Sequence, residues 1–182
     1  MEYLVLLLLF CFLLFSVAVL FFYTSLIVGL ILAKGVPFVS LPKKDWYKMC
    51  QSAKLKAGET VFDLGCGKAN LLTVAVKDFK VKGVGYEISL WPYFWARLRN
   101  WFYQTNLRLE LKNFLKADLR SADVVFCYLF PYVMGDLERK FATELKSGAR
   151  VVSYAFKLPN REPSEVISGN SDGTGKIYIY NY

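Results

Sequence analysis

The sequence predicts an α/β protein in which one N-terminal transmembrane helix precedes a doubly wound, mostly parallel seven-stranded sheet that ends in a β-hairpin. Three observations lead to this prediction. Residues 3–33 carry no charged side chain, strand and helix patterns alternate from residue 60 onward, and the turn-rich segment 168–175 separates two short final strands. We therefore expect an anchor at 1–33, a connector and short helix at 34–58, and a folded domain at 59–182.

The apolar segment 3–33 is longer than the roughly 20 helical residues that cross a hydrocarbon core of about 30 Å. No basic residue precedes it and the apolar run is too long for a cleaved signal peptide, so we expect a retained anchor. The basic residues nearest to it all follow it: Lys34, Lys43, Lys44 and Lys48. Because basic flanks stay on the cytoplasmic side, we expect a single-pass protein with its N-terminus outside and its domain on the cytoplasmic side.

The composition excludes several classes of function. The chain is 55% hydrophobic, carries a net charge of +8 and contains no histidine. The hydrophobic content excludes disorder, and the missing histidine excludes Ser-His-Asp catalysis and any metal site built on imidazole. The four cysteines form no CxxC pair, so we expect no metal. The basic residues are scattered without a nucleic-acid motif, which favours contact with anionic lipid over nucleic acid.

The strands are predicted as short apolar runs bounded by turn residues. The first five of them alternate with helices or loops, as in a parallel sheet with right-handed crossovers, and the last two form the hairpin. In chain order these strands are expected at 60–64, 82–87, 107–111, 122–127, 149–156, 164–167 and 176–180.

The helices are predicted from their spacing and their end signals. A short helix runs from Lys44 to about Leu55 and stops before Gly58. Ser89 is the predicted N-cap of a helix that has Pro92 in its first turn and runs to about Gln104. Two further helices are expected at 69–78 and 131–146.

A glycine turn after the first strand is the strongest chemical signal in the chain. Gly65 and Gly67 let a ligand approach the backbone next to the positive N-terminus of the following helix. Asp63 ends the buried strand, and Glu87 follows 20 residues after the second glycine, where an acid can bind ribose hydroxyls. The alternative for Asp63 is a cap on the turn amides, and for Glu87 a solvated strand end.

The residues 63–67 (DLGCG) together with 85–87 (GYE) resemble motif I and the acidic strand of class I S-adenosylmethionine-dependent methyltransferases, which have a Rossmann-like fold. The region 30–160 is further similar to the membrane-anchored protein-lysine methyltransferases, whose mitochondrial members modify the ATP synthase c subunit and the adenine nucleotide translocase. The sequence words that carry this similarity are 37–39 (PFV), 96–99 (ARLR), 129–134 (LFPYVM) and 148–153 (GARVVS). Lys68 and Ala69 depart from the Asp-Gly that is usual after the second glycine.

The resemblance implies that 59–182 is a methyltransferase domain with S-adenosyl-L-methionine as its cofactor. It assigns cofactor contacts to Asp63, Gly65, Gly67, Glu87, Asp118, Asn113 and Phe38. Asp118 has the alternative of a loop aspartate that makes its own turn. The aromatic residues after the fourth strand are expected to hold the acceptor lysine near the methyl group, with packing in the core as their alternative: Tyr128, Phe130 and Tyr132.

We therefore expect a protein-lysine N-methyltransferase that acts on a membrane or membrane-adjacent protein and contacts the lipid bilayer. Two alternatives stay open. One is a methyltransferase for a lipid-like small molecule such as a quinone or phospholipid. The other is a non-catalytic cofactor-binding scaffold, suggested by Lys68 and the short C-terminus. The aromatic helix 91–104 has two interpretations as well, a surface against lipid headgroups or ordinary core, and the core interpretation is favoured.

Overall fold

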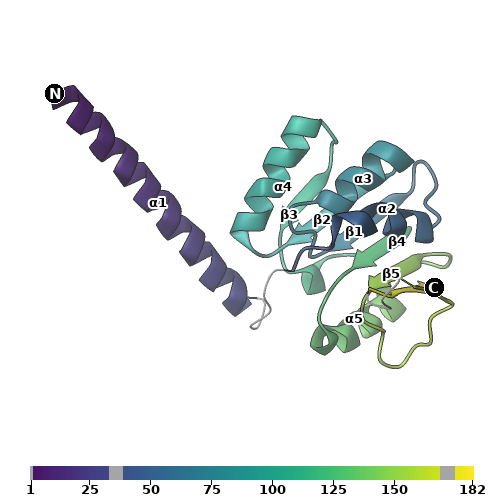
Figure 1. The fold of residues 1–182 in the computed structure, drawn as a ribbon. Helices are drawn as coiled ribbons and strands as arrows, with labels where there is room; N and C mark the ends of the chain where they lie inside the picture. The colour runs from purple at the N-terminus through teal and green to yellow at the C-terminus, as the bar shows by residue number, and fades with distance from the viewer. Residues whose placement is uncertain (1, 33–38, 169–174) are drawn as a thin grey trace.

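A computed structural model describes residues 2–32, 39–168 and 175–182. A long helix, α1 (Glu2–Leu32), leads into an α/β domain from which it projects (Figure 1). The domain elements in chain order are α2 (Lys43–Ser52), β1 (Thr60–Leu64), α3 (Asn70–Phe79), β2 (Lys82–Glu87), α4 (Leu90–Tyr103), β3 (Arg108–Leu111), the 3₁₀ turn η1 (Phe114–Lys116), β4 (Val124–Cys127), α5 (Pro131–Glu144), β5 (Arg150–Tyr154), β6 (Glu165–Ile167) and β7 (Ile177–Asn181).

The seven strands form one mixed sheet in the order β3-β2-β1-β4-β5-β7-β6. The first five strands are parallel, and β7 pairs antiparallel with both β5 and β6. The order reverses direction at β1, so the carboxyl ends of β1 and β4 border the crevice where open α/β sheets bind ligands. The predicted doubly wound sheet with its C-terminal hairpin is confirmed.

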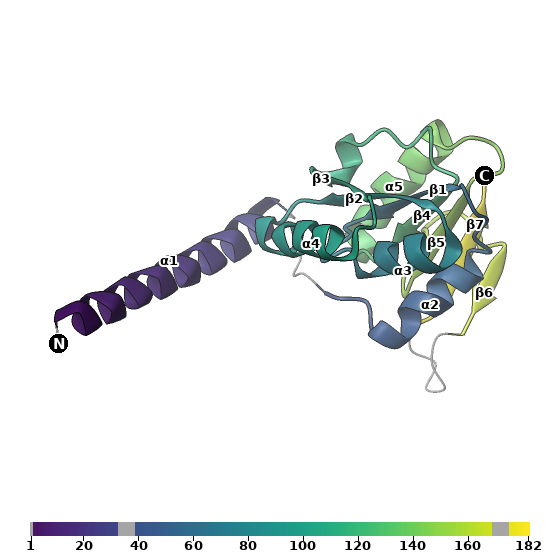
Figure 2. The same cartoon turned by 90° about the horizontal axis from the view of Figure 1, so that it is seen from above.

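Helices cover both faces of the sheet (Figure 2). Successive strand residues alternate between the two faces, so Val61 and Phe126 belong to one core while Phe62 and Val125 belong to the other. The first core packs against α2 and α3 through Met49, Cys50, Leu72 and Ala75. The second packs against α5 through Met134, Leu137 and Phe141.

One prediction about α4 is confirmed and another is wrong. Ser89 is the N-cap residue as predicted, although its side chain makes no capping hydrogen bond. The favoured interpretation of the α4 aromatic residues as core is wrong, because Pro92 and Ala96 are the buried residues of this helix. Most of the large side chains point outward, as the 75% exposure of Trp101 and the 70% exposure of Phe102 show, whereas Tyr93 is partly buried against the first core.

Within the described residues, α1 supplies one helix, Glu2–Gly29, that is long and apolar enough to cross a membrane. Nearly all of its large side chains are exposed, in agreement with the apolar pattern of the sequence. Its C-terminal part packs on the start of α4.

Candidate active site

The glycine turn between β1 and α3 is bonded to the neighbouring strand. The backbone N–H groups of Gly65 and Cys66 both donate to the carbonyl oxygen of Tyr86, at 2.9 Å each. Gly65 has φ +81° and Gly67 has φ +55°, in the left-handed region that glycine adopts without a steric penalty. Glycine at these two positions therefore adds no side chain between the turn backbone and the cleft that it lines.

Ala69 shows why its position favours glycine. This residue is the N-cap of α3 and has φ +56°, which is left-handed, and its side chain is fully buried. A non-glycine residue in this conformation is less stable by about 1–2 kcal/mol. The Ala69 N–H donates to the Cys66 carbonyl oxygen at 2.8 Å, which joins this residue to the glycine turn.

Glu87 at the end of β2 is held by three backbone amides. One carboxylate oxygen, Oε2, accepts from Gly67 at 2.9 Å, and Oε1 accepts from Ile88 at 2.9 Å and Ser89 at 2.8 Å. The side chain is 6% exposed, so the alternative of a solvated strand end is wrong. Burial raises the pKa of Glu87, while the three amide hydrogen bonds act in the opposite direction.

Asp63 at the end of β1 is a buried carboxylate that borders the cleft. Burial, and then the neighbouring Glu87 charge, raise its pKa from 3.8 to about 7. None of the hydrogen bonds between described residues reaches this carboxylate from the turn amides, so the alternative of a turn cap is not what the structure shows. Asp63 and Glu87 together place two acids beside the turn.

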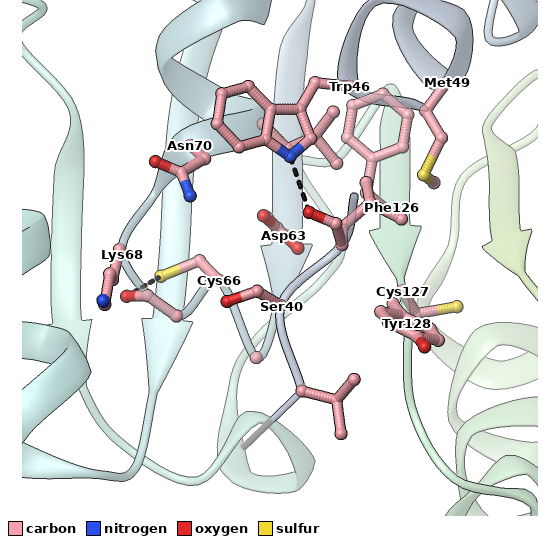
Figure 3. Close-up of a pocket in the computed structure, with 15 residues that line it drawn as sticks. Ser40, Trp46, Met49, Asp63, Cys66, Lys68, Asn70, Phe126, Cys127 and Tyr128 are labelled. Atoms are coloured by element: carbon pink, nitrogen blue, oxygen red, sulfur yellow. Dashed lines mark hydrogen bonds between the residues drawn. The ribbon is translucent and has the colours of Figure 1, made fainter. Parts of the chain in front are cut away.

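A cleft opens over the turn and is closed on one side by α2 (Figure 3). Trp46 and Met49 of α2 line it, and the Trp46 indole donates through Nε1 to the Leu41 carbonyl oxygen at 2.9 Å. The opposite wall is the end of β4. The remaining lining residues are Val39, Ser40, Leu41, Asp63, Gly65, Cys66, Gly67, Lys68, Asn70, Leu71, Phe126, Cys127 and Tyr128.

Several lining residues were missed by the sequence reasoning. Asn70 begins α3, and its Oδ1 is buried without a hydrogen-bond partner among the described residues. Trp46 and Met49 belong to the short helix predicted from Lys44 to about Leu55, but nothing in the local sequence indicates that this helix covers the turn. The one available signal for Asn70 was its place in the sequence, since it is a polar residue that follows the glycine turn.

Among the described residues, three predicted cofactor residues are not part of the cleft lining: Glu87, Asn113 and Asp118. Glu87 is joined to the lining through its hydrogen bond from Gly67. Phe38 lies outside the described residues. The Asn113 side chain accepts from the Leu115 N–H at 2.9 Å and so caps η1. Asp118 is exposed and accepts from the Arg120 backbone N–H at 3.0 Å and from its guanidinium, which holds the pKa of Asp118 well below its ordinary value. The arrangement of Asp118 matches the alternative of a loop aspartate that makes its own turn.

The aromatic residues after β4 are partly brought to the cleft. Tyr128 lines it and packs edge-to-face on Tyr154, with 5.0 Å between the ring centroids. Phe130 stacks on Phe156 at 6.1 Å, and Tyr132 in the first turn of α5 is 52% exposed. Of the three predicted acceptor-side residues, Tyr128 is therefore the one that the structure places at the cleft.

The chain is similar to characterised methyltransferases along most of its domain. A family model described as "ANTKMT methyltransferase domain" matches residues 63–165. The chain is 35% identical over 155 residues to a protein-lysine N-methyltransferase of Saccharolobus islandicus, which covers 79% of this chain and 93% of that protein. It is 30% identical over 148 residues to the adenine nucleotide translocase lysine N-methyltransferase of Mus musculus, with 80% of this chain covered but only 63% of the mouse protein.

Solved structures agree with these relatives on the fold. An RNA methyltransferase of Salinibacter ruber in complex with S-adenosyl-L-homocysteine superposes with a TM-score of 0.74 at 25% identity and covers 79% of this chain and 93% of that chain. TrmN of Thermus thermophilus has the same fold, with a TM-score of 0.68 at 13% identity, over 79% of this chain and 49% of that chain. The fold and the glycine turn with its two acids thus define an S-adenosylmethionine-dependent methyltransferase. Within that class, the chain belongs to the ANTKMT methyltransferase domain family.

The cleft residues fit S-adenosylmethionine, the cofactor of this class. The ligand carries a positive charge and hydroxyl groups, and the cleft offers the carboxylate of Asp63 beside an open glycine backbone. The buried, unpartnered Oδ1 of Asn70 supplies a further acceptor. Lys68 at the cleft edge is the one positively charged residue of the lining, and its charge repels a cationic ligand.

Proposed function

We propose that this chain is a protein-lysine N-methyltransferase that acts on a membrane or membrane-adjacent protein. The observation that carries the proposal is the 35% identity to the Saccharolobus islandicus protein-lysine N-methyltransferase over 93% of that relative's length. The mouse relative is named for the adenine nucleotide translocase and the Xenopus laevis relative for the c subunit of ATP synthase. Both names favour a substrate in or beside a membrane, although this chain spans less than two thirds of these two relatives.

The residues around the turn are proposed to bind the cofactor. Glu87 receives the ribose hydroxyls, because its carboxylate is already oriented by three backbone amides. Gly65 and Gly67 let the ligand pass close to the backbone, and Asp63 compensates its positive charge. When bound, S-adenosylmethionine supplies an electrophilic methyl group.

The acceptor lysine is proposed to enter past Tyr128, with Phe130 and Tyr132 beside the path. The apolar stem of a lysine packs well against aromatic rings, and an amine near a ring face is favourably placed. A lysine amine has a pKa of about 10.4 in water and must lose its proton before it can accept a methyl group. Desolvation in the cleft lowers that pKa, and with no histidine in the chain the proton passes to a carboxylate, to a tyrosine or to water.

The anchor α1 is proposed to hold the domain on the cytoplasmic side of a membrane as a single-pass span, with the N-terminus outside. Its length and the lysines that follow it support this orientation. Confinement to the same surface raises the effective concentration of enzyme and substrate. Protease treatment of sealed vesicles tests the orientation, because digestion of the domain from the non-cytoplasmic face would contradict it.

Transfer of labelled methyl groups tests the activity. Full-length protein in membranes is incubated with S-adenosylmethionine that carries a labelled methyl group, and protein bands are hydrolysed to identify the labelled amino acid. Label in methyl-lysine is the expected result. Label in the lipid extract alone would instead assign a lipid-like substrate and refute the proposal.

The variant Glu87→Ala tests the proposed role of Glu87 in cofactor binding. Calorimetry should show at least a tenfold loss of affinity for S-adenosylmethionine, since hydrogen bonds to a charged group contribute about 1.5–3 kcal/mol each. Glu162→Ala is the control, because the Glu162 side chain is 91% exposed at the surface. Equal affinity in both variants would exclude Glu87 from the cofactor site.

A further inference from the structure

Helix α4 presents its large apolar side chains to the outside of the domain. A helix that packs on a sheet normally turns such side chains inward, but the buried residues of α4 are Pro92 and Ala96. The exposed large apolar side chains of α4 are Leu90, Phe94, Trp95, Leu98, Trp101, Phe102 and Tyr103. All of them except Tyr103, which lies at the C-terminal end on the other side of the helix, share one side, and we name these six residues the α4 face. Such a surface needs a partner, because an apolar patch of this composition is unfavourable in water.

The α4 face forms one continuous stripe. At about 100° per residue its members span roughly 140° of the helix circumference. Arg97 and Arg99 fall on the two borders of this stripe, while Pro92 and Ala96 lie opposite to it. Aromatic residues between flanking arginines are typical of a helix that lies in the plane of a membrane interface.

The start of α4 is joined to the end of the proposed membrane span. The Ser25 hydroxyl of α1 accepts from the Trp91 backbone N–H at 2.8 Å, and so replaces the cap that Ser89 does not provide. The Phe22 and Trp91 rings are in edge-to-face contact, with 5.1 Å between their centroids. At Gly29 a Cβ would lie 2.6 Å from the Ser89 Oγ, so a larger residue would displace the Ser89 side chain and glycine favours the close approach of α1 to α4.

The position of this junction sets the depth of α4. The span Glu2–Gly29 has 28 residues and is therefore about 42 Å long, which exceeds a hydrocarbon core of about 30 Å. Ser25 and Gly29 at its end thus fall at the level of the headgroups. The aromatic contacts continue from Phe22 through Trp91 to Trp95, so the α4 face extends the apolar surface of α1 without a break.

We propose that the α4 face lies in the headgroup region of the same bilayer that α1 spans. This inference rests on the proposed anchoring by α1 and adds a second membrane contact within the domain itself. Ser89 also donates its backbone N–H to Glu87, so the junction borders the carboxyl end of the sheet where the cleft opens. The orientation therefore favours acceptor lysines that lie close to the membrane surface.

Collision rates of spin labels in the full-length protein test the proposal. A nitroxide at Phe102→Cys is compared with one at Val166→Cys, an exposed apolar position on β6, both with Cys11→Ser. The three remaining cysteines are buried: Cys50, Cys66 and Cys127. The protein is placed in phosphatidylcholine vesicles that contain phosphatidylglycerol, and each label is exposed to oxygen and to a water-soluble nickel chelate. Label on the native Cys11 reports separately on α1.

The expected result is a higher oxygen rate and a lower nickel rate at Phe102 than at Val166. A nickel rate at Phe102 equal to that at Val166 would place the α4 face in water and overturn the proposal. Low rates for both reagents would show that a second copy or another protein covers it, which also overturns the proposal. Leu98→Cys serves as a second position on the same face, and retained binding of S-adenosylmethionine shows that each variant is folded.

The Cys11 label separates this inference from the anchoring on which it rests. Oxygen access at Cys11 together with nickel access at Phe102 leaves the anchor intact and refutes the α4 face alone. Nickel access at Cys11 refutes the anchor and, with it, the proposed depth of α4.

Discussion

Replacing Asp63 by asparagine should stabilise the ligand-free protein at neutral and alkaline pH. The Asp63 carboxylate is 7% exposed, lies near Glu87 and receives no hydrogen bond from the turn amides among the described residues. Ionisation at this position is therefore unfavourable until a positive ligand arrives. Asparagine keeps the shape of the side chain without the charge.

The size of the effect follows from the pKa. Burial raises the pKa of Asp63 from 3.8 to about 7 in the folded state, whereas the unfolded chain keeps a value near 3.8. Between these two values the folded state binds a proton that the unfolded state has lost, so the free energy of unfolding falls as the pH rises. Each pH unit changes it by about 1.4 kcal/mol, which amounts to about 4 kcal/mol at most by pH 8. Asp63→Asn lacks this decrease, and its stability should match the wild type near pH 4.

Urea unfolding of the full-length protein in detergent micelles measures this difference. Tryptophan fluorescence is followed at pH 5 and pH 8 for the wild type, Asp63→Asn and the control Asp78→Asn, which replaces an exposed acid on α3. The free energy of unfolding of Asp63→Asn should exceed that of the wild type by an amount that grows with pH, and Asp78→Asn should show no such trend. If the two free energies of unfolding are equal at pH 8, or if their difference does not change with pH, then Asp63 ionises without penalty and the reasoning from burial is wrong.

Three further variants test other parts of the structure. Lys68→Gln should raise the affinity for the positively charged S-adenosylmethionine several-fold, up to about tenfold, while the affinity for the neutral S-adenosylhomocysteine changes little. Calorimetry measures both affinities, and equal changes for the two ligands would place the Lys68 charge away from the methyl-bearing sulfur. Tyr154→Phe removes a hydrogen bond of 2.6 Å to the buried Asp45 and should lower the free energy of unfolding by about 1–3 kcal/mol, which a urea titration measures; an unchanged midpoint would mean that the contact contributes nothing. Tyr128→Ala should reduce the rate of methyl transfer without changing the affinity for S-adenosylmethionine. Tyr128→Phe should retain part of the rate, because the ring that holds the lysine stem is kept. A loss of cofactor affinity in Tyr128→Ala would instead place Tyr128 on the cofactor side.

The strands were predictable because their signals are local. The strands β1 and β2 occupy the predicted ranges 60–64 and 82–87, and the other strands differ from prediction by one or two residues at their ends. Each of these strands is a short apolar run between turn residues, and the glycine turn marks where the ligand edge of the sheet lies. The acids Asp63 and Glu87 were predictable for the same reason, since both lie at the ends of strands.

The other wall of the cleft was not predictable in this way. Trp46 and Met49 reach the turn only because α2 folds back over β1, and the sequence of α2 shows an apolar face without showing what it covers. Glu87 was predicted to be a ligand-binding acid, but its three amide partners, which come from the turn and from the segment before α4, were not predicted. Such partners depend on the distances between elements, which no local pattern contains.

The sequence by itself determined the long apolar helix, the α/β class and the glycine turn with its acids. The signals for these features, which are apolar length, alternating periodicity and turn residues, act between neighbouring positions. Only the tertiary structure decided which side of α4 faces the sheet. Both sides of that helix carry apolar residues, and the small side chains of Pro92 and Ala96 are the ones buried there. At the start of α4, Ser25 and Gly29 of the apolar helix α1 contact this helix, whose aromatic side faces outward.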